Sequence, residues 1–259
     1  MSEHGVIDVN VTLSRWPTRR LPLDETPALV AKLRALGVTQ AWASSYDALL
    51  HRDLGAVNAR LADECRRSGD FLLAFGCVNP MIPDWEEELR RCHEDHKMPG
   101  IRLFPNYHGY KLDHPDFARL LALAADRGLI VQIPLSMEDE RAMHPLLNVP
   151  SVEAAPLRPF VKSIPKLRLV LLNALRTVRL PVLPQLAPPG VFFDIATQET
   201  VGGVASLAKL ISPARILFGT GSPFFYPESA FLKMKESALP EETARRIFVD
   251  NARTLLGRA

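Results

Sequence analysis

The sequence predicts an α/β protein built as a single (β/α)8 TIM barrel that spans residues 1–259. Two observations lead to this prediction. Short apolar runs, eight in all, alternate with longer amphipathic runs from one end of the chain to the other, and they are apolar on both faces, as parallel strands covered by helices are. The chain also has the usual length of one such barrel. A doubly wound open sheet is the alternative, but no GxGxxG or Walker motif accompanies it here.

The elements follow from this alternation. Prolines, 22 in number, stand at the ends of segments and do not form a continuous tract. The expected strands lie at residues 5–11, 38–44, 71–79, 100–104, 129–135, 167–173, 191–196 and 215–221. Helices are expected between and after them, near residues 26–36, 53–68, 83–96, 115–127, 151–163, 180–187, 200–211, 227–237 and 241–256.

The first and fourth of these helices have the clearest start and stop signals. Thr26 is expected as an N-cap with Pro27 in the first turn, and Gly37 as the residue that ends the helix. Pro115 opens the later helix and Gly128 ends it. The apolar stripes of the two helices are Leu29, Val30, Leu33 and Leu36, and Phe117, Leu120, Leu121 and Ala124.

Composition excludes several classes of function. The net charge is +2 with both signs mixed along the chain, so nucleic acid and anionic membranes are not expected as partners. No apolar run approaches the roughly 18 residues that span a bilayer. The polar start MSEHGVID does not resemble a signal peptide, and three scattered cysteines indicate a reducing compartment. We therefore expect a cytoplasmic protein. The interface of a possible homo-oligomer could be formed by residues 181–189 and three tryptophans, Trp16, Trp42 and Trp85.

Four short motifs, in order, extend over the whole chain. They are ID at 7–8, GIRLFP at 100–105, the GTxSP turn at 219–223 and FVDNARTLLG at 248–257. With the eight-fold alternation, they resemble the amidohydrolase-related family of metal-dependent hydrolases and decarboxylases. The resemblance implies a TIM barrel with its active site at the carboxyl ends of the strands.

The metal ligands that this resemblance implies are missing. The two histidines of the first strand fall on Asn10 and Thr12, and the aspartate of the eighth strand falls on Gly221. The histidines of the fifth and sixth strands fall on Pro134, or Gln132 in a shifted register, and on Asn173. Because amides, hydroxyls, Pro and Gly are poor ligands or none, we expect neither a catalytic transition metal nor another cofactor.

Two loops after neighbouring strands, 104–115 and 135–145, carry most of the remaining polar side chains expected at the mouth of the barrel. As catalytic candidates we select His108 and His144, either of which could be a general acid or base, and Asp139, which could orient one of them. Arginine, tyrosine and amide side chains suit a small anionic molecule. The candidates for binding it are Arg102, Tyr107, Gln132, Arg141, Asn10, Asn173 and Arg176.

Structural interpretations of these residues stay open. Arg102 could pair with Asp8, Asp139 with Arg141, His144 could cap a turn, and the floor amides could satisfy one another. The leading hypothesis is a metal-independent hydrolase or lyase acting on a small carboxylate-bearing molecule. The alternative is a catalytically degenerate barrel that binds a small molecule or regulates. A third possibility is a relocated metal site at His108, His144 and Asp139.

Overall fold

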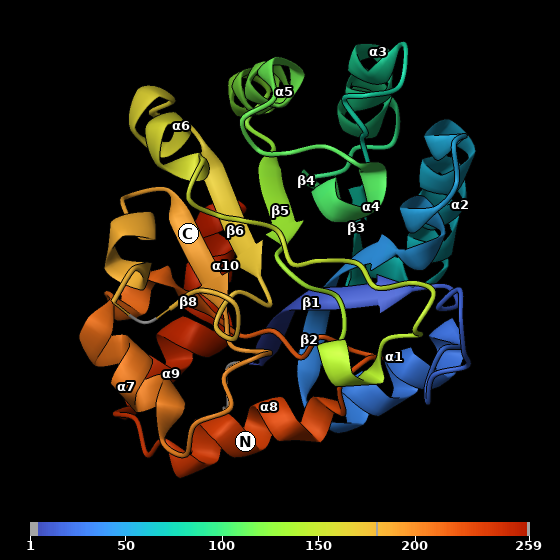
Figure 1. Cartoon of the computed structure of the whole chain (residues 1–259). Helices are drawn as coiled ribbons and strands as arrows, with labels where there is room; N and C mark the ends of the chain where they lie inside the picture. Colours follow the sequence, from blue (N-terminus) through green and yellow to red (C-terminus); the bar gives the residue numbers. More distant parts are fainter. Residues whose placement is uncertain (1–4, 180, 258–259) are drawn as a thin grey trace.

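The computed structural model describes residues 5–179 and 181–257, apart from the side chain of residue 140. Eight parallel strands form one sheet in the order β1-β2-β3-β4-β5-β6-β7-β8, with helices between them, which confirms the predicted barrel (Figure 1). The strands are β1 (Val6–Leu13), β2 (Val38–Ser45), β3 (Leu72–Gly76), β4 (Gly100–Arg102), β5 (Ile130–Pro134), β6 (Arg168–Leu172), β7 (Val191–Asp194) and β8 (Ile216–Leu217).

The first and last strands meet along the backbone that follows β8. The N–H of Val9 donates to the carbonyl of Phe218 at 3.0 Å, and that of Thr12 donates to the carbonyl of Ser222 at 2.9 Å. The N–H of Gly221 donates in the opposite direction, to the carbonyl of Asn10, at 2.9 Å. These bonds bring the turn after β8 against the middle of β1.

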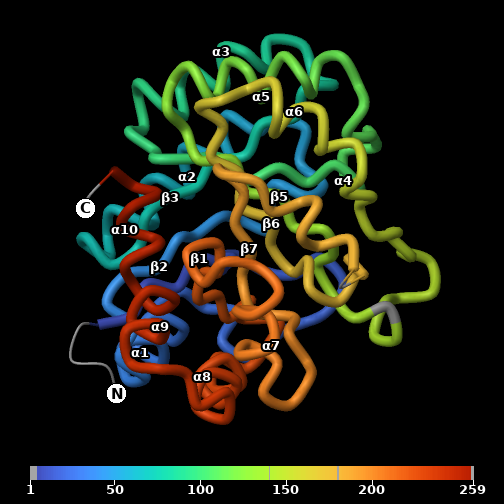
Figure 2. The backbone as a smooth tube through the Cα atoms, turned by 90° about the vertical axis from the view of Figure 1, so that its left-hand side faces the viewer, coloured from blue at the N-terminus to red at the C-terminus, as the bar shows by residue number. Residues whose placement is uncertain are grey.

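The helices surround this sheet. Figures 1 and 2, which differ by a quarter turn, both place α3, α5 and α6 on one side and α1 and α8 on the other. Among the described residues, no helix is long and apolar enough to cross a membrane. The helices are α1 (Thr26–Ala35), α2 (Leu54–Arg67), α3 (Trp85–Arg90), α4 (Pro105–His108), α5 (Pro115–Asp126), α6 (Leu157–Ser163), α7 (Gly203–Leu210), α8 (Pro227–Glu236), α9 (Glu241–Arg245) and α10 (Asn251–Leu255).

Several boundaries differ from the prediction. Thr26 is the first helical residue of α1 and not its N-cap, since Glu25 takes that position without a side-chain hydrogen bond. Helix α6 begins only at Leu157; before it, the N–H of Val152 donates to the carbonyl of Leu135, just after β5, and the residues directly preceding the helix form a turn. Within the described part of 180–187 there is only a 3-10 turn, Leu183–Leu186.

The apolar core lies on both sides of the sheet. The larger cluster fills the layer between strands and helices, and a second cluster, with Trp42 stacked on Phe75, fills the inside of the barrel. Trp16 and Trp42 are buried, so they are part of the core and do not form a surface interface. All three cysteines are buried and free, as expected.

Candidate functional site

The floor of the barrel carries three hydrogen-bonded side chains from three strands. Asn10 lies on β1, Asn173 follows β6, and Asp194 ends β7. The Asn10 amide nitrogen donates to Asn173 Oδ1 at 2.9 Å and to Asp194 Oδ2 at 2.7 Å. The other carboxylate oxygen of Asp194 accepts from the backbone N–H of Asn173 at 2.8 Å. Both amide hydrogens of Asn10 are therefore used within the protein.

Arg102, the last residue of β4, is fully buried and extends across the barrel to β1. Its Nε donates to Gln132 Oε1 at 2.9 Å, while Nη1 donates to the hydroxyl of Thr12 and the carbonyl of Val11, both at 3.0 Å. Its Nη2 makes longer contacts of 3.4 Å to backbone carbonyls of β1 and β2. Arg102 therefore forms no ion pair with Asp8, although the sequence allowed that interpretation. Burial lowers the pKa of Arg102 to about 10, which leaves the guanidinium charged at neutral pH.

Asp8 holds the turn that follows β8. Its Oδ1 accepts from the backbone N–H groups of Asn10 and Thr220, each at 3.0 Å, and its Oδ2 accepts from the Thr220 hydroxyl at 2.6 Å. The Thr220 hydroxyl also contacts the Ser222 hydroxyl at 2.8 Å. Burial raises the pKa of Asp8 to about 6, although the hydrogen bonds act in the opposite direction. Burial also raises the pKa of Asp194.

Aromatic side chains also follow the carboxyl ends of three strands. We call Trp16, Tyr46 and Phe224, which follow β1, β2 and β8, the aromatic cap. The ring centroid of Trp16 lies 4.6 Å from that of Phe224 and 5.2 Å from that of Tyr46, both edge to face. With Phe104 they belong to one buried cluster. Asn10 and Thr12 are each only 3% exposed, so these floor residues are closed to solvent.

The two candidate histidines lie in different surroundings. His108, at the end of α4, places Nε2 2.9 Å from the carbonyl oxygen of Ala48. Because a carbonyl only accepts, Nε2 carries the hydrogen. Burial lowers the pKa of His108. His144 is exposed, and its Nδ1 accepts from the backbone N–H of Leu146 at 3.2 Å, which is the turn-capping role.

The third catalytic candidate, Asp139, pairs with arginines. Its carboxylate accepts from Arg141 at 2.6 Å and from Arg176 at 2.9 Å, and these bonds hold its pKa well below the usual range. Among the described residues no hydrogen bond or ion pair joins Asp139 to His108 or His144. Each of the three residues proposed for catalysis therefore has other partners, and within the described chain no hydrogen bond links them to one another.

The binding candidates fall into three groups. Asn10 and Asn173 join one another in the floor, and Gln132 joins Arg102 while its Nε2 donates to the Val9 carbonyl at 2.9 Å. Arg141 and Arg176 share Asp139 at the surface. Tyr107 is half-buried and lies edge to face against Trp16, with ring centroids 6.1 Å apart.

A family model described as Amidohydrolase matches residues 16–258, which is almost the whole chain. The chain belongs to the amidohydrolase family. No curated protein matches it.

Solved structures of the same fold include several decarboxylases. A 2,6-dihydroxybenzoate decarboxylase from Rhizobium superposes with a TM-score of 0.76 at 16% identity, covering 98% of this chain and 99% of that one. A 5-carboxyvanillate decarboxylase from Sphingomonas paucimobilis gives 0.77 at 13% identity, covering 98% and 99%. A dihydroxybenzoic acid decarboxylase from Polaromonas sp. JS666, solved with manganese and 2-nitroresorcinol, gives 0.76 at 12% identity, covering 98% and 97%. At these identities the likeness establishes the fold.

The residues at the amidohydrolase metal positions do not fit a metal. Asn10 and Thr12 are occupied by protein partners, Asp194 and Arg102 respectively. At Gly221, whose φ is +69°, an added Cβ would lie 2.6 Å from a ring carbon of Phe225. An aspartate side chain would therefore collide with that ring. Within the described part of the chain, no three His, Cys, Asp or Glu residues come together to hold a metal, and this includes the proposed set of His108, His144 and Asp139.

Sequence reasoning missed two hydrogen-bonded residues that hold the turn after β8 in this amidohydrolase barrel. Asp8 is predicted only as a partner of Arg102, and Thr220 is not among the predicted functional residues. Both stand inside the ID and GTxSP motifs, which is the signal that could have found them. The aromatic cap left no comparable signal, because its three members are far apart in sequence.

Proposed function

We propose that this chain is a catalytically degenerate amidohydrolase barrel that binds a small anionic molecule and does not carry out metal-dependent turnover. One observation carries the proposal. The guanidinium of Arg102 donates to Thr12, which stands where the family resemblance implies a metal ligand, and to Gln132, which takes such a position in the shifted register of the fifth strand. The positively charged guanidinium of Arg102 thus lies among these side chains.

Electrostatics supports this interpretation. A divalent ion 4 Å from a guanidinium would be repelled by about 8 kcal/mol at an effective dielectric constant of roughly 20. Arg102 has few ways to lose its charge, since its pKa of about 10 remains far above neutrality. The two buried carboxylates of the floor, Asp8 and Asp194, supply the opposite charge. Without a bound metal, the barrel would lack metal-activated water, which is the usual source of hydroxide at neutral pH in such barrels.

The surroundings of the catalytic candidates also favour binding over turnover. A general base is normally oriented by a second group and exposed to substrate. Asp139 instead forms ion pairs with Arg141 and Arg176, and His144 caps an exposed turn.

A metal-independent lyase or hydrolase is the second candidate. It is favoured by His108, whose lowered pKa keeps the imidazole unprotonated near neutral pH and whose Nδ1 has no hydrogen-bond partner among the described residues. The decarboxylases of the same fold suggest aromatic carboxylates as compounds to assay.

The test uses the purified full chain. Metal content is measured after incubation with Zn²⁺ and with Mn²⁺ and gel filtration, and release of CO₂ from 2,6-dihydroxybenzoate and 5-carboxyvanillate is followed with and without added metal. We expect far less than one ion per chain and no CO₂ release. One bound ion per chain together with chelator-sensitive turnover would overturn the proposal. Turnover that is insensitive to chelators and lost in His108→Ala would favour the second candidate.

A further inference from the structure

A cavity of about 520 Å³ lies beside the aromatic cap, away from the polar floor of the barrel. It is formed by the loops that follow β2, β3 and β4, at residues 49–52, 79–83 and 107–108. These loops are at the carboxyl ends of neighbouring strands, the face on which TIM barrels bind small molecules. The volume is within the range of small-molecule sites.

Arg52 gives this cavity its charge. Among the described lining residues, the basic side chains are Arg52 and two histidines, and burial lowers the pKa of His108. No aspartate or glutamate is among these described lining residues. Arg52 is exposed, and within the described chain no hydrogen bond or ion pair engages its guanidinium. An unpaired guanidinium at the edge of a cavity is suited to a carboxylate, which it can bind through two parallel hydrogen bonds.

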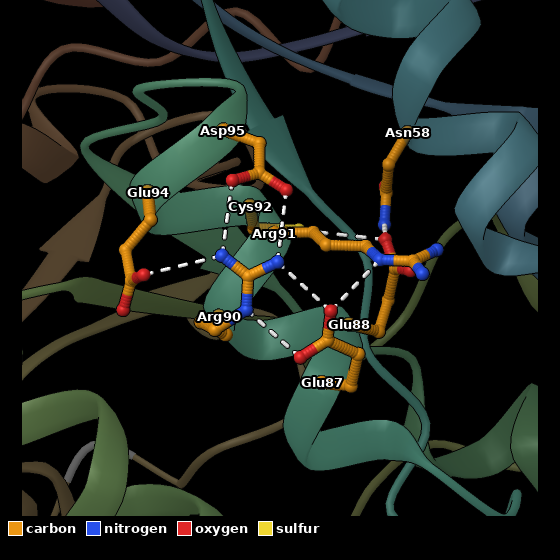
Figure 3. Close-up of polar contacts among 8 residues, drawn as sticks. All are labelled: Asn58, Glu87, Glu88, Arg90, Arg91, Cys92, Glu94 and Asp95. Atoms are coloured by element: carbon orange, nitrogen blue, oxygen red, sulfur yellow. Dashed lines mark hydrogen bonds and ion pairs between the residues drawn. The ribbon is translucent and has the colours of Figure 1, made fainter.

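A neighbouring cavity of about 390 Å³ provides a comparison, because Arg91 lines it together with Arg52. Figure 3 shows that Arg91 is already engaged: its Nε donates to Glu87 at 3.1 Å. Glu87 and Glu88 line this neighbouring cavity as well, so its α3 side is acidic. Arg52 and Asn79 line both cavities, so a second negative charge that extended from the larger cavity into the neighbouring one would meet these carboxylates. The pair of cavities therefore favours a ligand with one carboxylate.

The rest of the larger cavity combines an apolar wall with one polar group. Leu50 is 62% exposed and lines the cavity with Met81 and Ile82. Asn79 is only 8% exposed, and its Oδ1 accepts from the backbone N–H of Met81 at 3.0 Å. Its Nδ2 has no hydrogen-bond partner among the described residues and remains a donor available to a ligand.

We propose that this off-axis cavity binds a small amphipathic monocarboxylate, whose carboxylate pairs with Arg52 and whose apolar body lies on Leu50, Met81 and Ile82. The inference rests on the proposed function and adds the place and the ligand class to it. Binding beside the aromatic cap requires no opening of the barrel floor.

Isothermal titration calorimetry of the full chain with benzoate tests the proposal, with benzamide as the uncharged ligand of the same shape. We expect benzoate to bind and benzamide to bind at least about 10-fold more weakly, as the loss of a charge-assisted hydrogen bond implies. Arg52→Gln should weaken benzoate to a similar extent. Arg253→Gln is the matched control, because Arg253 is also exposed and unpaired within the described chain; it should leave the dissociation constant unchanged.

Three results would overturn the inference. Benzoate bound equally by wild type and Arg52→Gln would place the ligand elsewhere, while a binding function would stand. Inorganic phosphate bound as tightly as benzoate would mean a general anion site. Failure of benzoate and also of hexanoate to bind would reject the ligand class. None of these depends on metal content or CO₂ release, so failure of the proposed function is measured separately.

Discussion

The guanidinium of Arg102 donates a hydrogen bond of 3.0 Å to the hydroxyl of Thr12, inside a barrel whose family resemblance implies a metal ligand at position 12. The same guanidinium reaches Gln132 on the neighbouring strand β5. A buried charge of this kind is tolerated only where its hydrogen bonds are made by the protein. The side chain therefore has a structural role that its removal should expose.

Arg102→Met should lower the free energy of unfolding by about 3–5 kcal/mol, because it leaves the Gln132 and Thr12 oxygens and several carbonyls without a donor inside the barrel. Urea denaturation followed by circular dichroism measures this loss. Arg253→Met serves as the surface control and should change the value by less than about 0.5 kcal/mol. A loss from Arg102→Met as small as that of the control would contradict the structural role.

Asp8 should make stability depend on pH. Its pKa rises from the ordinary aspartate value of 3.8 to about 6 in the folded chain, so the folded state binds the proton more tightly than the unfolded state. The stabilising contribution of the bound proton is complete below about pH 4 and is lost as the pH rises through about 6, by about 3 kcal/mol in total. Asp8→Asn removes this titration. The difference in unfolding free energy, wild type minus Asp8→Asn, should therefore fall between about pH 4 and about pH 7. A difference that stays constant over this interval would contradict the raised pKa.

Gly221→Asp should not create a metal site. The φ of +69° and the ring of Phe225, 2.6 Å from the added Cβ, should cost about 1–3 kcal/mol of stability. Gly221→Ala is the matched variant, since it has the same steric conflict without a carboxylate, and should be destabilised similarly. Denaturation of both proteins and metal analysis of Gly221→Asp measure the effect. Uptake of one Zn²⁺ per chain by the aspartate variant would show that the position can still serve a metal.

Trp16→Ala should open the aromatic cap. Trp16 is 6% exposed and contacts both Tyr46 and Phe224, so its truncation should lower stability by about 3–5 kcal/mol. Hydrogen exchange followed by mass spectrometry should then show faster exchange of peptides that contain Asn10 and Thr12. Tyr226→Ala, which truncates an aromatic residue that is 69% exposed, is the control and should leave both measurements unchanged. Unaltered exchange around Thr12 in Trp16→Ala would mean that the cap does not protect the floor.

The positions of strands and helices could be predicted from sequence, whereas the contacts of the site residues could not. Strand and helix positions follow from apolar periodicity, a local property. They agree with the structure except near ends such as Leu157 and in the segment 180–187, whose described part holds only a 3-10 turn. The position of Arg102 inside the barrel also followed from alternation along β4. Its partners did not, because they belong to other strands and depend on how far the side chain reaches.

The amino-acid sequence by itself determined the eight-fold barrel and the replacement of the expected ligands by Asn10, Thr12 and Gly221, since residue identity alone shows which atoms can bind a metal. Tertiary structure decided how these positions are used. Asn10 meets Asp194 across 184 residues, and Arg102 meets Thr12 across 90. Contacts over such separations depend on the closure of the barrel and on side-chain rotamers, neither of which leaves a periodic pattern in the chain.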